Sequence, residues 1–185
     1  MSPAQAGAFV TSDTGAMTRI APEVVLLCGI AGSGKTTFAH RLEQDGYLRL
    51  AIDEEIWERY GRYGIDYEAI EYAQRSLLAE ASLREKLIFG IGLGRNIVID
   101  KAFWNRATRD AYRRLISDAG GACRLVYLKA EPELLRKRLA QRAERFDANA
   151  AFPITDQKLA MYLRFFEEPR GEGEEVILVA DDKDG

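Results

Sequence analysis

The chain has 185 residues, of which 47% are hydrophobic and 30% are charged. A chain of this length buries enough apolar surface for one domain with a core, and its composition excludes a disordered, collagen-like or coiled-coil protein. The formal net charge of -3 argues against a dedicated nucleic-acid-binding protein, which usually has a strongly basic surface.

Residues 1–22 lack the early basic cluster followed by an apolar segment that defines a secretory signal. No apolar run in the sequence approaches the ~20 residues that a membrane-spanning helix needs. We therefore expect a flexible tail over residues 1–22, a single domain over residues 23–185, and a cytoplasmic protein that does not enter a membrane.

Short apolar runs alternate with longer amphipathic segments along the rest of the chain. Five runs rich in branched or large apolar residues, as expected of strands buried on both faces, lie at residues 24–28, 47–52, 96–100, 122–128 and 175–180. Four segments with apolar residues three and four apart, as expected of amphipathic helices, lie at residues 35–45, 67–92, 104–119 and 131–145. Strands separated by helices of this length form right-handed crossovers, so the sequence predicts an α/β fold with a mostly parallel sheet.

The first predicted strand is followed by a loop with the pattern G-x-x-x-x-G-K-[ST]. The loop and the residue after it are Gly29, Ile30, Ala31, Gly32, Ser33, Gly34, Lys35, Thr36 and Thr37. In this pattern the glycines let backbone N–H groups point at nucleotide phosphates, the helix N-terminus adds partial positive charge, and the lysine reaches the outer phosphates. We expect these residues to bind a nucleoside triphosphate, with the Thr36 hydroxyl on Mg²⁺. The loop alone leaves kinases, GTPases, motors and transporters open.

Two carboxylates follow the second and third predicted strands. Asp53 ends the run 47–53 and Asp100 ends the run 96–100, so both are expected at the carboxyl edge of the sheet, near the phosphate loop. Asp53 can orient an acceptor hydroxyl and accept its proton there, which makes it the candidate catalytic base, although an aspartate also suits a helix cap. Asp100 is a candidate for the metal ion or the acceptor, with a turn or helix cap as the alternative.

Arginines in two later segments are candidates for contact with the substrate. Arg109 lies in the first turns of the predicted helix 104–119 and is expected to reach the acceptor. In the segment 131–145, Arg138 and Arg142 are four residues apart and therefore share one helix face. Arginines so placed can clamp a transferring phosphoryl group, which makes both candidate catalytic residues, and a solvated basic face is the alternative.

Together these features resemble the P-loop kinases of the nucleoside-monophosphate-kinase-like group. This group includes chloramphenicol phosphotransferase, zeta toxins, gluconate and shikimate kinases and the phage polynucleotide kinase domain. The resemblance rests on the loop, on Asp53 and on the segment from Asp100 to Arg109, and it covers roughly residues 23–180. That segment is also similar to ATP-binding proteins of the AAA-family kinases.

The resemblance implies a three-layer sandwich with a five-stranded parallel sheet of order 2-3-1-4-5 and a helical lid at about residues 136–155. It also implies ATP or GTP with Mg²⁺, Asp53 as the base or acceptor-orienting residue, and Arg142 or its neighbour along the nucleotide.

The residues that follow Asp53 are expected to line the acceptor side of the site. Residues 53–72 are acidic and rich in aromatic side chains, among them Trp57, which is a candidate for substrate contact. Such a surface repels phosphodiesters and suits a neutral or cationic acceptor, although a solvated acidic face over a tyrosine-rich core is the simpler explanation.

We therefore expect a phosphotransferase that moves the γ-phosphoryl group of ATP to a hydroxyl of a small molecule. A sugar-like metabolite is one candidate acceptor, and an antibiotic is a candidate that the resemblance alone implies. Two alternatives stay open. A 5′-hydroxyl polynucleotide kinase would use the arginines of residues 106–114 and of the lid as a phosphate track. A nucleotide-binding regulatory or toxin-like module would turn nucleotide over only incidentally.

Overall fold

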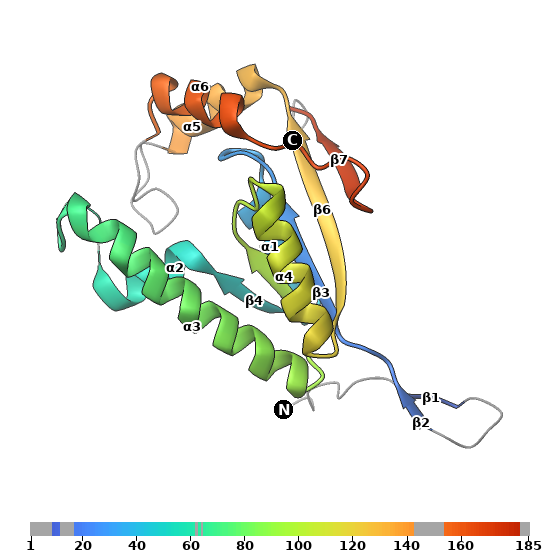
Figure 1. The fold of residues 1–185 in the computed structure, drawn as a ribbon. Helices are drawn as coiled ribbons and strands as arrows, with labels where there is room; N and C mark the ends of the chain where they lie inside the picture. The colour runs from blue at the N-terminus through green and yellow to red at the C-terminus, as the bar shows by residue number, and fades with distance from the viewer. Residues whose placement is uncertain (1–8, 12–16, 62, 64, 143–153, 182–185) are drawn as a thin grey trace.

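The computed structural model describes residues 9–11, 17–61, 63, 65–142 and 154–181. A five-stranded parallel sheet lies at its centre (Figure 1). The strands are β3 (Glu23–Cys28), β4 (Leu48–Ala51), β5 (Ile97–Asp100), β6 (Ala122–Ala130) and β7 (Glu175–Val179). Their spatial order is β4-β5-β3-β6-β7. Numbered along the chain within this sheet, that is 2-3-1-4-5, so the predicted order is confirmed.

Helices cover both faces of the sheet. On one face, α1 (Lys35–Gln44) packs its Ala39, Phe38 and Leu42 against inward residues of β3, β5 and β6. On the other face, α3 (Tyr72–Gly92) and α4 (Arg106–Asp118) supply Leu83, Leu87, Tyr112 and Ile116 to the larger core cluster. The central strand β3 is enclosed by both clusters, and its last five side chains are 0% exposed. The layers are therefore those of an α/β/α sandwich, as predicted.

Two further groups of helices surround the carboxyl ends of the strands. The helix α2 (Ile52–Tyr60) packs on α3 in a cluster of Ile56, Ala79 and Tyr67, the last from the segment between the two helices. A short 3-10 turn (Ala69–Glu71) precedes α3. The helices α5 (Pro132–Arg142) and α6 (Asp156–Phe165) lie together at one end of the sheet (Figure 1). They share a cluster of Leu135, Leu139 and Leu159, against which Ile30 and Ala31 of the glycine-rich loop pack. Of the expected lid over 136–155, residues 143–153 lie outside the described part of the chain.

The element boundaries differ from the prediction at two places that matter for the site. The second strand ends at Ala51 rather than Asp53, so that Asp53 lies in the first turn of α2. In the segment predicted as a tail, β1 (Phe9–Thr11) and β2 (Met17–Arg19) form a short antiparallel ladder, which is drawn away from the five-stranded sheet in Figure 1.

Candidate functional site

The glycine-rich loop connects β3 to α1 with a backbone that only glycine adopts readily. Gly32 and Gly34 have φ values of 88° and 92°, and Gly34 is the N-cap of α1. A Cβ at Gly29 would lie 2.7 Å from the backbone oxygen of Leu128. Because the N-cap residue has no side chain, it leaves the N–H groups of the first turn of α1 free of a side-chain cap, which suits an anion.

Lys35 lies against this loop and beside two carboxylates. Its Nζ donates hydrogen bonds to the carbonyl oxygens of Gly29 at 2.9 Å and Ile30 at 3.0 Å. Burial lowers the pKa of Lys35, and the nearby carboxylates of Asp100 and Asp53 oppose that shift. Lys35, which the motif predicts to bind the phosphates, therefore interacts electrostatically with both predicted carboxylates.

Asp100 ends β5, and Asp53 lies in the first turn of α2, just after the neighbouring strand β4, so both are at the same edge of the sheet. Ala51 at the end of β4 pairs in register with Asp100 at the end of β5, and Asp53 follows two residues later. Burial and then the Asp100 carboxylate raise the pKa of Asp53, while Arg142 and Lys35 oppose the rise. Asp100 is 8% exposed, and its Oδ2 has no hydrogen-bond partner among the described residues.

Neither aspartate is a helix N-cap, which was the alternative explanation for Asp53 and, together with a turn cap, for Asp100. The N-cap of α2 is Ala51, with no side-chain cap, and Asp53 lies inside the first turn. The N-cap of α4 is Asn105, whose side chain accepts a hydrogen bond from the Thr108 backbone N–H at 2.8 Å.

A cavity of about 1640 Å³ joins these groups. Its lining includes nearly all the predicted site residues, namely Gly29, Ile30, Ala31, Gly32, Ser33, Gly34, Lys35, Thr36, Thr37, Asp53, Asp100, Arg138 and Arg142. Arg138 also ties α5 to the end of the last strand, because its Nη2 donates to the Ala180 carbonyl at 3.2 Å. Trp57 is half-buried on α2 and is not part of the lining.

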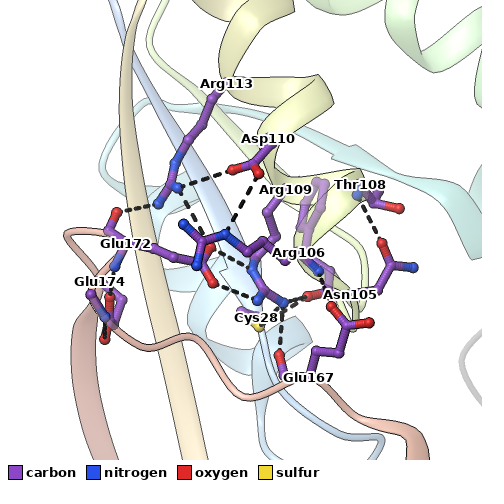
Figure 2. A network of polar contacts seen from close by, with 12 residues as sticks. Cys28, Asn105, Arg106, Thr108, Arg109, Asp110, Arg113, Glu167, Glu172 and Glu174 are labelled. Carbon is purple, nitrogen blue, oxygen red and sulfur yellow. Dashed lines mark hydrogen bonds and ion pairs between the residues drawn. The ribbon is translucent and has the colours of Figure 1, made fainter.

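Arg109 does not reach the cavity, contrary to the prediction. Its side chain is 0% exposed and forms a two-pronged ion pair with Glu172, with Nε at 2.8 Å from Oε2 and Nη2 at 2.6 Å from Oε1. Its Nη1 donates to the carbonyl oxygens of Phe103 and Glu167, both at 2.9 Å (Figure 2). The residue therefore holds the loop before β7 to the start of α4.

Several other side chains in the cavity wall had no predicted role there. They are Ser76, Glu80, Lys101, Trp104, Lys158 and Tyr162. Tyr63 and Tyr72, from the aromatic segment expected on the acceptor side, also line the cavity. One signal in the sequence could have found part of this set: Tyr72, Ser76 and Glu80 recur every four residues, which places them on one face of a helix.

The residues at the phosphate loop fit a magnesium ion. Thr36 and Asp100 line the same cavity, and the unpartnered Asp100 Oδ2 is an oxygen donor of the kind that Mg²⁺ takes. Within the described ranges no group of three or more His, Cys, Asp and Glu side chains could hold a metal ion by itself. A magnesium ion here would therefore depend on nucleotide phosphates and water for its other ligands, as is usual for this ion.

The sheet order, the glycine-rich loop before α1, and the lysine beside two carboxylates at the carboxyl edge of the sheet define a P-loop protein with the α/β fold of the P-loop kinases. The AAA domain family matches residues 24–169, and the chain belongs to this family. Among proteins of curated function, none matches the chain. In the described residues no helix is both long and apolar enough to span a membrane.

Solved structures share this fold at low sequence identity. A candidate kinase from Chloroflexus aurantiacus superposes with a TM-score of 0.68 at 17% identity, covering 86% of this chain and 85% of that one. A gluconokinase from Sinorhizobium meliloti gives 0.57 at 19%, covering 88% and 86%. A chain of the Pnkp1/Rnl/Hen1 RNA repair complex gives 0.60 at 20%, covering 94% of this chain and 55% of that one.

Proposed function

We propose that this protein is a phosphotransferase that moves the γ-phosphoryl group of ATP or GTP to a hydroxyl group of a small molecule. The observation that supports this most is the position of Asp53, at the same sheet edge as Asp100 and electrostatically coupled to Lys35. A P-loop nucleotide site uses the loop, the lysine and one carboxylate for Mg²⁺, whereas a second carboxylate near the phosphates can act on an acceptor hydroxyl, as a kinase requires.

In the proposed reaction, Asp53 accepts the proton of the acceptor hydroxyl as its oxygen forms a bond to the γ-phosphorus. The bond from that phosphorus to the bridging β–γ oxygen breaks, and the nucleoside diphosphate leaves with the electron pair. Lys35, Arg138 and Arg142 neutralise the charge that develops on the phosphoryl oxygens. Mg²⁺ held by Thr36 and Asp100 would supply further charge neutralisation and orient the phosphates.

A 5′-hydroxyl polynucleotide kinase is the second candidate, since one structural neighbour belongs to an RNA repair complex. That function would use the arginines of α4 as a track for backbone phosphates. Arg109, in the first turn of that helix, is enclosed and paired with Glu172 instead. We therefore favour a small acceptor, with an antibiotic or a sugar-like metabolite as the candidates.

The test is to incubate the protein with γ-labelled ATP or GTP, Mg²⁺ and a panel of hydroxylated antibiotics, sugars, nucleosides and a 5′-hydroxyl oligonucleotide. We expect label in a small molecule, reduced about 10²- to 10⁴-fold in Asp53→Asn with nucleotide binding retained. Glu58→Gln, on the same helix but outside the cavity, is the matched control. Label in the oligonucleotide would favour the second candidate. Free phosphate alone, released equally by wild type and Asp53→Asn, would instead indicate a nucleotide-dependent regulatory or toxin-like module.

A further inference from the structure

An ion pair that the proposed chemistry does not use forms part of the cavity wall. Glu80 comes from α3 and Lys101 directly follows Asp100 at the end of β5. The Lys101 Nζ donates a hydrogen bond to Glu80 Oε2. Their side chains are 19% and 20% exposed, and both residues line the cavity. The pair is therefore accessible from the same space as Asp53.

Two further side chains, Tyr112 and Arg84, hold the Glu80 carboxylate in place. The Tyr112 hydroxyl, on a side chain that is fully buried in the core, donates to Oε1 at 2.6 Å, and Arg84 Nε lies 3.3 Å from the same oxygen. Burial by itself would raise the pKa of Glu80, but the hydrogen bonds from Lys101 and Tyr112 outweigh it and lower the pKa. Glu80 is thus a fixed, ionised acceptor whose charge is already balanced by cations.

The pair, which lines the cavity, keeps unused hydrogen-bonding capacity. An ammonium group has three donors, and in the part of the chain that the structure describes Lys101 has one acceptor, Glu80. Each carboxylate oxygen of Glu80 can accept more than one hydrogen bond. A pair that offers donors and acceptors together, without net charge, matches a neutral hydroxyl group, which both donates and accepts. The pair would bind an amine or a carboxylate of the acceptor poorly, because Glu80 and Lys101 already neutralise each other's charge.

The cavity wall around the Glu80–Lys101 pair is aromatic and carries a few polar side chains. Tyr72, Ser76 and Glu80 lie on one face of α3, and all three line the cavity. The ring of Tyr72 packs edge to face on Tyr63 with centroids 5.7 Å apart, and Tyr63 is also in the lining. The Asp53 carboxylate contributes to a raised pKa of Tyr72, after burial, so the aromatic wall lies within electrostatic range of the proposed base. Aromatic walls with a few fixed polar groups are typical of small-molecule sites.

Resting on the proposed function, we infer that Glu80 and Lys101 bind a second hydroxyl of the acceptor, one that is not phosphorylated. The acceptor is then a neutral polyol with at least two hydroxyl groups, rather than an amine or a simple alcohol. A site built to hydrogen-bond a hydroxyl discriminates strongly against analogues that lack it, because its own polar groups lose their partner.

The test uses transfer of label from γ-labelled ATP to single acceptors of known chemistry. Sorbitol, myo-inositol and glucose represent neutral polyols, glucosamine a cationic analogue, gluconate an anionic one, and cyclohexanol a single hydroxyl. We expect neutral polyols to be the best acceptors. For the best of them, Lys101→Met and Glu80→Gln should raise the acceptor KM about 10- to 100-fold while the KM for ATP stays unchanged.

Lys129→Met is the matched control, because Lys129 also forms an ion pair, with Glu168, but is not in the cavity lining. If Lys101→Met only lowers the melting temperature and leaves the acceptor KM at the control value, the pair is structural and the inference is wrong. A cationic, anionic or single-hydroxyl compound as the best acceptor would also overturn it while leaving the proposed function intact. Absence of transfer to every acceptor class, with nucleotide bound, would contradict the proposed function and this inference together.

Discussion

Arg109 and Glu172 are 63 positions apart in the chain and form a buried ion pair with two parallel hydrogen bonds. The exposed fractions of their side chains are 0% and 2%. Arg113 Nη1 also lies 3.4 Å from Glu172 Oε2, and Cys28 at the end of β3 borders the same group (Figure 2). The pair thereby joins α4, the loop before β7 and the strand that leads into the phosphate loop.

Replacing Arg109 should destabilise the protein strongly, because the change removes the two shortest hydrogen bonds of a buried carboxylate and leaves it only the longer contact with Arg113. We expect Arg109→Met to lower the free energy of unfolding by about 3–5 kcal/mol in urea denaturation. Arg106→Met is the matched control on the same helix, since its side chain is 59% exposed and its pair with Asp110 is a surface one, where about 0–1 kcal/mol is usual. Equal effects of the two substitutions would show that burial of the pair has no energetic consequence.

The same pair predicts how stability depends on pH. Hydrogen bonds from Arg109 lower the pKa of Glu172 below its usual 4.5, although burial opposes this. A group whose pKa is depressed by folding stabilises the protein above its unfolded pKa, and this contribution is lost as pH falls through the folded pKa. The stability difference between wild type and Glu172→Gln should therefore be full near neutral pH and shrink below about pH 4.5. A difference that is constant from pH 7 to pH 3 would contradict the coupling.

If Asp53 is the base, the pH profile of kcat/KM for phosphoryl transfer should have an acid limb at an unusually high pH. Burial, and then Asp100, raise the pKa of Asp53 above the ordinary 3.8, so kcat/KM should begin to fall at a higher pH than an unperturbed aspartate would give. Asp100→Asn removes one cause of the rise, and the limb should move to lower pH whatever the remaining activity. Asp118→Asn, at the exposed end of α4, should leave the limb in place. An acid limb that stays in place in Asp100→Asn would argue against Asp53 as the titrating group.

Lys35 should be required for transfer while a lysine elsewhere in the molecule is not. Lys35→Met removes the cation that the loop places beside the phosphates, and we expect transfer to fall about 10²- to 10³-fold or more, with weaker nucleotide binding. Lys137→Met removes the same charge from α5, where the lysine pairs with Asp181 outside the cavity lining, and should have little effect. Binding of a fluorescent ADP analogue and labelled transfer measure the two effects separately. Full transfer by Lys35→Met would overturn the proposed function.

Gly29 should tolerate no side chain. A Cβ there would lie 2.6 Å from Ser33 Oγ and 2.7 Å from the Leu128 backbone oxygen, and backbone cannot move aside easily. We expect Gly29→Ala to abolish nucleotide binding by isothermal titration calorimetry. Gly92→Ala, where a Cβ meets nothing within 4 Å and φ is not positive, is the control and should change stability by no more than about 1 kcal/mol. Nucleotide binding that survives in Gly29→Ala would show that the loop adapts.

Features that depend on near neighbours in the chain were predictable from the sequence. The loop from Gly29 to Thr36 is a local pattern between a strand and a helix, and the apolar runs located all five strands of the parallel sheet. Asp100 was expected at the sheet edge because parallel strands bring their carboxyl ends to one side, and the register with Ala51 places it there. The strand order came from the resemblance carried by these same residues.

Features that depend on which elements meet were decided only by the tertiary structure. The periodicity of α4 shows that it is amphipathic, but not that Glu172 would meet Arg109 and enclose it away from the cavity. Glu80 and Lys101 lie 21 residues apart, on a helix and just after a strand, and only the packing of α3 beside β5 makes them a pair in the wall of the cavity that Asp53 also lines. A sequence encodes which face of a helix is buried, whereas the partner it meets is set by how the helices pack on the sheet.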